Sequence, residues 1–273
     1  MNQIRAPQVA GYFYPADSEK LKRDLSLLLS TAKFSKSFEK IIGLISPHAG
    51  YIYSGKTAAY AYNLLKGKSY KTVIVISPSH AEYFSGISIY KGSAYETPLG
   101  IVEVDEAKAN KLIEGSQIIF RGIEGHRKEH ALEVQIPFLQ SVLKGFKLVP
   151  VVMGDQGKLY VDELANQISK VMDDETLIVA SSDMSHFYSA YEADQRDSIV
   201  EKRINQFDFE SLQKDLDTHI CEACGGGPIV AMMKAASLQN YRKAEVINRS
   251  DSGDVTGDKS EVVGYLSAVI YGD

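Results

Sequence analysis

Short apolar segments alternate with longer amphipathic segments along most of the chain, and this alternation predicts an α/β fold. Short uninterrupted apolar runs, bounded by Pro, Gly or polar residues, are typical of strands that are buried on both faces of a sheet. The clearest such runs cover residues 41–45, 73–76, 148–153 and 177–180. The segments between them carry apolar residues at helical spacing, so we expect crossover helices and parallel strands.

Further elements are predicted around this central pattern. Asp17 or Ser18 can cap a helix whose leucines between residues 21 and 29 share one face. Weaker strand patterns cover residues 86–90, 101–104, 244–248 and 262–270, and helical patterns cover 54–65, 105–114, 132–139, 159–172, 190–216 and 229–236. Because no change in composition divides the chain, we predict a single domain over residues 1–273. Its fold class is α/β, with a central, largely parallel or mixed sheet between helices.

Three of the predicted buried strands end in a loop that carries a histidine. Two of these loops have the form Ser-Pro followed by His48 or His80, and the third ends in His186. Proline cannot donate to a sheet ladder, so each Ser-Pro marks the end of a strand. The carboxyl ends of parallel strands form the edge where open α/β sheets bind ligands. We therefore predict that His48 and His80 lie on adjacent strand ends and share a site.

A metal site is the economical interpretation of these paired histidines. Imidazole suits Fe, Cu and Zn, and two histidines with one anionic ligand leave coordination positions open for a substrate or O₂. The anion could come from Glu129, Glu133, Asp183 or Cys224, and the residue types alone do not choose among them. His130 and Glu133 are three positions apart, so on a helix they would share one face. Either residue could therefore belong to the site.

Two other motifs suggest different chemistry. Residues 50–57 match the phosphate-binding pattern G-x-x-x-x-G-K-T, but Tyr and Ile stand where the backbone must wrap closely around phosphates. Cys221 and Cys224 have the spacing of a redox pair or of half a zinc site, although no second pair completes a Cys₄ site. The zinc deaminase pattern fails because Ile220, rather than proline, precedes Cys221. Nucleotide binding and deamination are therefore not expected.

Composition narrows the class of protein further. The chain has a net charge of -5, which gives no reason to expect nucleic acid or an anionic membrane as a partner. It contains no apolar run long enough to span a membrane, and its N-terminus lacks the apolar core of a signal peptide. Two cysteines three positions apart are no disulfide framework. We expect a soluble, cytoplasmic protein.

Taken together, the motifs resemble those of the Memo family, whose microbial members are called AmmeMemoRadiSam system protein B. The matching segments follow the family order over nearly the whole chain. They are residues 10–15 (AGYFYP), 47–51 (PHAGY) with 54–55 (SG), 77–80 (SPSH), 97–100 (TPLG), 129–133 (EHALE) with 137–138 (PF), 181–186 (SSDMSH), and 224–225 (CG) with 228–229 (PI). In fold this family is similar to class III extradiol ring-cleaving dioxygenases, which implies one α/β domain with a central sheet between helices.

The resemblance implies the roles of several residues. His48, His80 and Cys224 become the metal ligands, with Cys224 at the place where those dioxygenases use a glutamate. His186 matches their acid/base histidine, and Asp183 lies beside it. We add His130 to this catalytic group. Predicted substrate contacts are Tyr51, Tyr53 and Glu133. Cys221 is an extra thiol near the site and has no assigned role.

The expected metal is non-haem Fe(II), with Cu or Zn as alternatives, since a thiolate in place of a carboxylate favours softer ions. One hypothesis is a metal-dependent oxidoreductase that acts on a small substrate, for which a phenol is a candidate. The other is a metal-retaining binding or scaffold protein that works with radical-SAM and AMMECR-type partner proteins. Consumption of O₂ would distinguish the two hypotheses.

Overall fold

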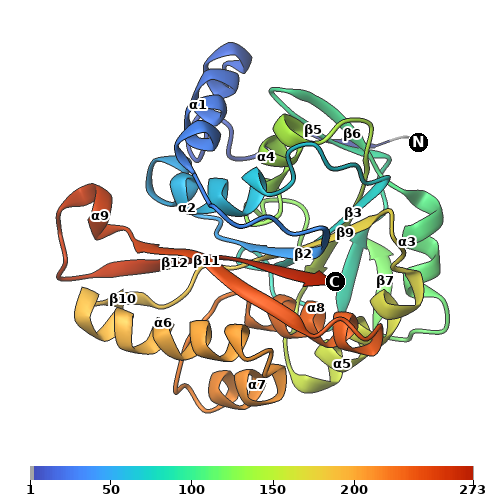
Figure 1. Ribbon diagram of the computed structural model, residues 1–273. Coiled ribbons are helices and arrows are strands. Elements are labelled where there is room, and N and C mark those ends of the chain that lie inside the picture. Colours follow the sequence, from blue (N-terminus) through green and yellow to red (C-terminus); the bar gives the residue numbers. More distant parts are fainter. Residues whose placement is uncertain (1–2, 273) are drawn as a thin grey trace.

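Four parallel strands form the centre of a nine-stranded mixed sheet in the computed structural model, which describes residues 3–272 (Figure 1). In spatial order they are β2 (Lys40–Ser46), β9 (Thr176–Ser181), β3 (Thr72–Pro78) and β8 (Lys147–Met153). Nearly all their residues are buried, as continuous apolar runs predict. β2 and β3 do not pair with each other, because β9 lies between them and pairs with both. The prediction that His48 and His80 follow adjacent strands is therefore wrong: a strand from much later in the chain separates them.

Further strands extend this sheet on both sides. On the β2 side are β12 (Val262–Gly272), β11 (Lys243–Asp251) and β10 (His186–Tyr188), and on the β8 side are β4 (Ile87–Tyr90) and β7 (Ile119–Gly122). A separate three-stranded sheet consists of β1 (Ile4–Arg5), β5 (Ala94–Thr97) and β6 (Gly100–Glu103). β5, β7 and β10 were not predicted, since their 4, 4 and 3 residues are too few to show a period of two.

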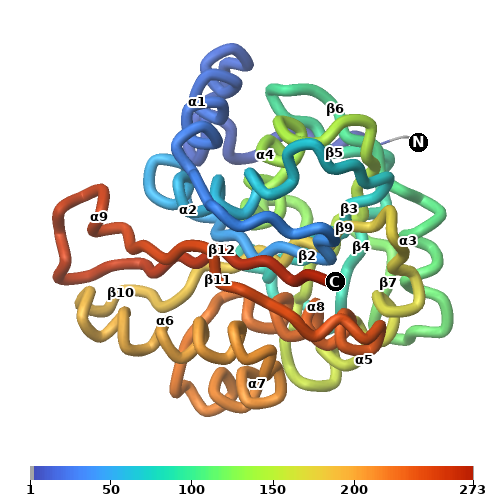
Figure 2. The backbone as a smooth tube through the Cα atoms, in the orientation of Figure 1, coloured from blue at the N-terminus to red at the C-terminus, as the bar shows by residue number. Residues whose placement is uncertain are grey.

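Helices cover both faces of the large sheet (Figures 1 and 2). One face carries α1 (Ser18–Thr31), α2 (Tyr51–Asn63) and α4 (Gln135–Val142), which contact one another. The other carries α5 (Lys158–Val171), α6 (Ala190–Asn205), α7 (Phe209–Asp217) and α8 (Gly226–Leu238). α3 (Glu106–Ile113) packs beside α5 and β7, and α9 (Gly253–Thr256) lies between β11 and β12. This arrangement confirms the predicted α/β fold with a mixed sheet between helices.

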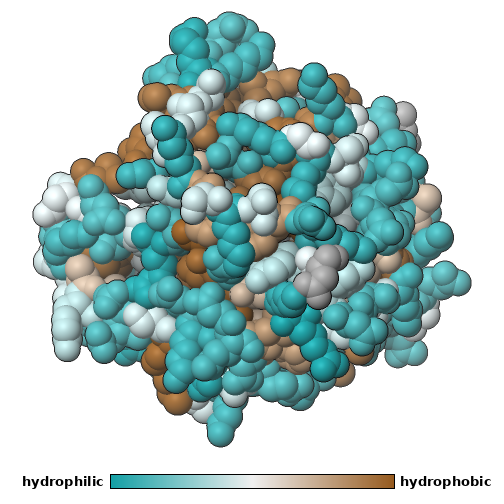
Figure 3. All heavy atoms as spheres, viewed as in Figure 1, coloured by the Kyte–Doolittle hydropathy of each residue, from teal (hydrophilic) through white to brown (hydrophobic). Residues whose placement is uncertain are grey.

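The outer surfaces of these layers agree with the sequence pattern. Hydrophilic side chains cover much of the face seen in Figure 3, and apolar ones show between them.

Asp17 caps α1, because its carboxylate accepts a hydrogen bond of 2.7 Å from the main-chain N–H of Lys20. No helix within residues 3–272 is both long and apolar enough to cross a membrane.

The position at which α2 starts shows how residues 50–57, which match the phosphate-binding pattern, are folded. The helix begins at Tyr51, earlier than the predicted start near Ser54, so residues 51–55 are helical. A phosphate loop needs these residues as an open turn whose N–H groups surround the phosphates. Lys56 is exposed on the helix surface. The motif is therefore part of a helix, and the expectation of no nucleotide site agrees with this geometry.

Candidate metal centre

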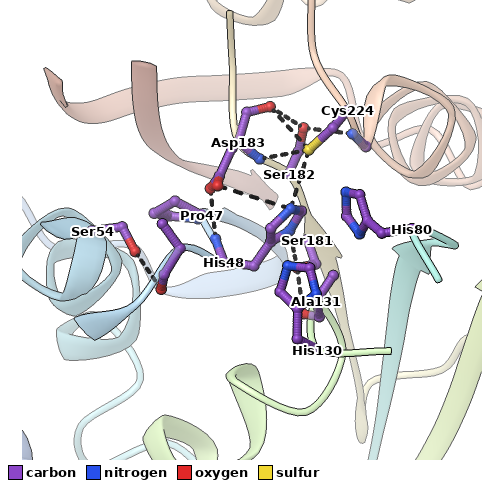
Figure 4. Close-up of polar contacts among 12 residues, drawn as sticks. Pro47, His48, Ser54, His80, His130, Ala131, Ser181, Ser182, Asp183 and Cys224 are labelled. Atoms are coloured by element: carbon purple, nitrogen blue, oxygen red, sulfur yellow. Dashed lines mark hydrogen bonds and ion pairs between the residues drawn. The ribbon is translucent and has the colours of Figure 1, made fainter. Parts of the chain in front are cut away.

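The loops that follow β2, β9 and β3 meet at the carboxyl edge of the sheet (Figure 4). They carry His48, Asp183 and His80, and the loop before α8 brings Cys224 to the same place. His48 Nε2 lies 3.1 Å from Cys224 Sγ, and the ring centroids of His48 and His80 are 5.1 Å apart. One ligand atom from each of His48, His80 and Cys224 lies within 4.8 Å of the other two. The structure thus brings the three predicted ligands together.

Hydrogen bonds determine which nitrogen of His48 faces the thiol. His48 Nδ1 lies 2.9 Å from Ser181 Oγ. The single hydroxyl proton of Ser181 is donated to the carbonyl of Ala131 at 2.7 Å, so Oγ must accept from Nδ1–H. The same oxygen also accepts from Gln135 Nε2 at 2.7 Å. Nε2 of His48 therefore presents its lone pair toward Cys224, as a metal ligand requires.

The surroundings of His48 also keep its ring neutral. Burial lowers the pKa of His48 well below its usual value, and the neighbouring His80, His130 and His186 act in the same direction. A histidine binds a metal only in the neutral form. The ring is thus held in both the tautomer and the protonation state of a ligand.

Removing the Ser181 hydroxyl should weaken metal binding although no ligand is removed. We expect Ser181→Ala to lower metal affinity about 10–100-fold, because residues that orient ligating histidines contribute on this scale. Competition with a chromophoric chelator measures the change. Ser267→Ala is the matched control, since Ser267 is also fully buried but its hydroxyl makes no hydrogen bond within the described residues. Equal affinity in Ser181→Ala and the unmodified protein would show that this hydroxyl does not orient His48.

Glu129 orients His80 in the way that Ser181 orients His48. Its Oε1 lies 3.0 Å from His80 Nδ1, and main-chain N–H groups of His80, His130 and Ala131 donate to the same carboxylate. Burial acts to raise the pKa of Glu129, but the hydrogen bonds and charge of His80 and the main-chain N–H groups together lower it to about 2. The ionised carboxylate accepts from Nδ1–H and leaves Nε2 of His80 available for a metal.

A second group of possible ligands contains His80, Glu129 and His130, whose ligand atoms also lie within 4.8 Å of one another. The hydrogen bonds to the Glu129 carboxylate already engage both of its oxygens. We therefore regard Glu129 as the residue that orients His80. His130 stacks on His80, with ring centroids 4.8 Å apart, and lies 5.5 Å from the His48 ring. The structure places His130 beside the predicted ligands, where burial lowers its pKa.

The predicted helical face shared by His130 and Glu133 is absent, because α4 begins only at Gln135. Glu133 points into the interior and is fully buried. Its carboxylate pairs with Arg5 Nη1 at 2.7 Å, and accepts from the Tyr14 hydroxyl and the main-chain N–H groups of Gln8 and Val9. These bonds fasten the N-terminal segment to the turn before α4. The predicted contact of Glu133 with substrate does not fit this position, because its carboxylate is buried and both oxygens are already bonded within the protein.

Tyr51 is likewise a core residue. Its hydroxyl donates to the carbonyl of Val134 at 2.6 Å, and its ring packs against Tyr14 and Phe138. Tyr53, two positions further along α2, is 38% exposed. Of the two tyrosines predicted to contact substrate, only Tyr53 is open to solvent, because α2 turns the Tyr51 side chain toward the core.

Asp183 lies between His48 and Cys224. Its Oδ1 accepts from the His48 main-chain N–H at 2.7 Å, its Oδ2 lies 3.9 Å from His48 Nε2, and its own N–H donates to Cys224 Sγ at 3.2 Å. Burial raises the pKa of Asp183 to about 7. Burial, followed by the nearby Asp183, also raises the pKa of the Cys224 thiol, which outweighs the favourable N-terminus of α8. A bound cation would lower both pKa values, because metal ligands lose their protons on binding.

Gly225 lets the Cys224 loop lie directly against the end of β9. A Cβ atom at this position would be 2.1 Å from the Ser181 carbonyl oxygen and 2.8 Å from Ser182 Cβ. The Gly225 N–H instead donates to Ser182 Oγ at 2.9 Å. A larger residue would push the loop, and with it the Cys224 thiol, away from His48.

A pocket of about 330 Å³ opens beside Cys224. His186, on β10, also lines this pocket, so the predicted proton-transfer histidine and the predicted thiol ligand face one space. Burial lowers the pKa of His186. Cys221 contributes to the same wall and is 1% exposed. The remaining lining residues are Gln156, Met184, Gln213, Leu216, Asp217, His219, Glu222, Ala223, Gly226 and Gly227.

Comparison with known proteins identifies the family. Residues 5–269 match the family described as Memo-like protein. The chain belongs to the Memo family. A MEMO1 family protein of Thermoplasma volcanium is 38% identical over 268 residues, which cover 97% of this chain and 98% of the relative. A MEMO1 family protein of Methanocaldococcus jannaschii is 35% identical over 288 residues, covering 99% and 100%.

One solved structure shows the same fold at much lower identity. It is an uncharacterized protein from Escherichia coli K12, with a TM-score of 0.57, 14% sequence identity and coverage of 85% of this chain and 100% of that one. This likeness bears on the fold alone. Membership of the Memo family confirms the resemblance found in the motifs, while the roles of the individual site residues stay predictions.

Proposed function

We propose that this Memo-family protein is a metal-dependent oxidoreductase that binds non-haem Fe(II) or Cu through His48, His80 and Cys224. The proposal is carried by one observation: the three ligand atoms lie within 4.8 Å of one another. Ser181 and Glu129 support it, because each occupies Nδ1 of one histidine and leaves Nε2 free. Zn is the alternative ion for the same ligands.

The ligand set fits a redox-active ion. Two neutral imidazoles and one thiolate suit Fe, Cu and Zn, and the thiolate favours softer ions than a carboxylate would. Three protein ligands leave coordination positions open, so a bound redox metal would supply electron transfer between a small substrate and O₂. The pocket beside Cys224 offers the space in which such a substrate would lie.

The residues around the ligands would position the substrate and move protons. His186 lines the pocket and can take a proton from a substrate hydroxyl group, for example that of a phenol. The Asp183 carboxylate accepts from the main-chain N–H of His48, and the Asp183 main-chain N–H donates to Cys224 Sγ, so Asp183 would set the spacing of these two ligands. His130 stacks on His80 and would shield that side of the ring from solvent.

Two measurements test this proposal on protein purified without a His tag and without added metal. Elemental analysis should find close to one Fe or Cu per chain. The metal-loaded protein should then consume O₂ with at least one member of a panel of phenols and thiols, and His186→Gln should slow that consumption without removing the metal. A bound metal with no O₂ consumption across the panel would favour the metal-retaining binding protein, with radical-SAM and AMMECR-type proteins as the partners to test.

A further inference from the structure

We propose that Asp197 is a positioning residue, which fixes the orientation of His186 in the pocket by acting through the peptide group between Met184 and Ser185. The inference rests on the proposed function, because it takes His186 as the residue that moves a proton. It adds the buried carboxylate that orients this histidine. Three observations support it: the hydrogen bonds of one peptide group, the irregular backbone around His186, and the burial of Asp197 without an ion pair to the nearby arginine.

Asp197, on α6, bonds to the main chain directly before His186. Its Oδ1 accepts a hydrogen bond of 3.1 Å from the main-chain N–H of Ser185. Burial lowers the pKa of His186, whereas a hydrogen bond from its ring to the main chain of Met184 acts to raise it. The acceptor is the Met184 carbonyl, since a protonated imidazole can only donate. This carbonyl and the Ser185 N–H belong to the same peptide group.

This peptide group connects the carboxylate to the imidazole. It is planar and trans, so its N–H and its C=O point in opposite directions, one toward Asp197 and the other toward His186. Hydrogen bonds in such a chain polarise one another, and a carboxylate is a strong acceptor. Asp197 therefore favours donation from the His186 ring to Met184. The nitrogen that donates is thereby fixed, and the other nitrogen is left for the pocket that His186 lines.

The strand that carries His186 is too irregular to hold the ring by itself. β10 pairs with β12 through His186 and Tyr188, and the register shifts between these two residues. Phe187, between them, has a φ of 63°, which a residue other than glycine rarely adopts. Its side chain is 70% exposed, so burial of the ring does not explain this conformation. Such backbone persists only where surrounding contacts impose it, and the hydrogen bond to Asp197 is one of them.

β12 provides the space for the Asp197 carboxylate. A Cβ atom at Gly264 would overlap Asp197 Oδ2 and would lie 3.2 Å from Met184 Cβ. The main chain of Gly264 accepts a hydrogen bond of 2.8 Å from the Met184 N–H and donates one of 2.9 Å to the Ser185 carbonyl. Asp197 and Gly264 therefore hold this short segment from two different elements.

Packing alone does not explain a carboxylate at position 197. Asp197 is 4% exposed, and burying a carboxylate is unfavourable unless it is paired or hydrogen-bonded. The charge of Arg249 acts on Asp197, but the ion pairs of Arg249 are with Asp194 and Glu201. An apolar residue would fill the same space at a lower cost. The carboxylate is therefore explained by the Ser185 N–H that it accepts.

Substitutions at Asp197 in the full-length, metal-loaded protein test the inference. Asp197→Ala should lower kcat for O₂ consumption about 10–100-fold, since a displacement of about 1 Å at a reacting group costs on the order of a hundredfold. KM and metal content should not change. Asp197→Asn should recover most of the rate, because its amide oxygen can still accept from Ser185. If Asp197→Ala does not fold, Asp197→Leu replaces it, since leucine fills the space and offers no acceptor.

NMR of the imidazole nitrogens gives a readout that does not depend on turnover. In Zn-loaded protein, the His186 signals are identified as those missing from His186→Gln. They should show one dominant tautomer in the unmodified protein and in Asp197→Asn, and a mixture of tautomers in Asp197→Ala. Asp194→Ala is the matched control, because it removes a carboxylate three positions earlier on α6 that pairs with Arg249 instead.

An unchanged His186 tautomer in folded Asp197→Ala protein would overturn the inference. So would an equal effect in Asp194→Ala, or a failure of Asp197→Asn to restore the tautomer and the rate. If the unmodified protein holds its metal but consumes no O₂ with any member of the panel, the proposed function fails, and the NMR comparison still decides whether Asp197 orients His186.

Discussion

Cys224→Ser protein should lose most of its bound metal, whereas Cys221→Ser protein should keep it. The two cysteines line the same pocket, but only Cys224 Sγ lies beside His48 Nε2, at 3.1 Å. Burial, followed by the charge of Asp215, raises the pKa of Cys221 to about 11, and this thiol belongs to neither group of possible metal ligands within the described residues. A serine hydroxyl stays protonated near neutral pH and is a much poorer ligand than a thiolate for soft ions.

Elemental analysis of protein purified without a His tag measures this difference, and thermal unfolding of both variants checks that each is folded. Cys221→Ser is the matched control, because it makes the same chemical change three positions away in the same pocket wall. If Cys221→Ser emptied the centre and Cys224→Ser did not, the thiol assignment would be wrong. If neither variant lost metal, Asp183 would become the preferred third ligand, since Arg5 already engages Glu133.

His48→Ala and His80→Ala should each abolish stoichiometric metal binding. Each variant removes one of two imidazole ligands, and the remaining imidazole and thiol cannot hold the ion alone at comparable affinity. The side chain of His80 is 33% exposed, so its removal leaves little cavity, whereas His48 is 2% exposed and is bonded to Ser181. We therefore expect His48→Ala also to lower the free energy of unfolding, by about 1–3 kcal/mol, because Ser181 loses a buried partner.

His219→Ala is the control for both variants, since His219 is an exposed histidine that lines the pocket but lies outside the groups of possible metal ligands. Metal content and the midpoint of urea unfolding are measured together. Full occupancy in folded His48→Ala or His80→Ala protein would refute the proposed ligand set. A loss of metal in His219→Ala would instead indicate that the metal ligands lie at the mouth of the pocket, near His219.

The central strands and their ends could be predicted from the sequence alone. β2, β3, β8 and β9 are continuous apolar runs that the structure buries, and such runs show themselves in a single pass along the chain. Proline after β2 and within the last residues of β3 located the loops that carry His48 and His80. These local signals, with the family motifs, were sufficient to select the residues that the structure brings together.

The order of the strands and the partners of each ligand were decided by the tertiary structure. β9 separates β2 from β3, although no local signal distinguishes that order from direct pairing. Glu129 and Glu133 are equivalent in a sequence pattern, yet one bonds to His80 and the other to Arg5, because a turn rather than a helix joins them. Ser181 reaches His48 across 133 positions of the chain. Hydrogen bonds between such distant segments determine which nitrogen of His48 faces the Cys224 thiol. They leave no periodicity in the sequence.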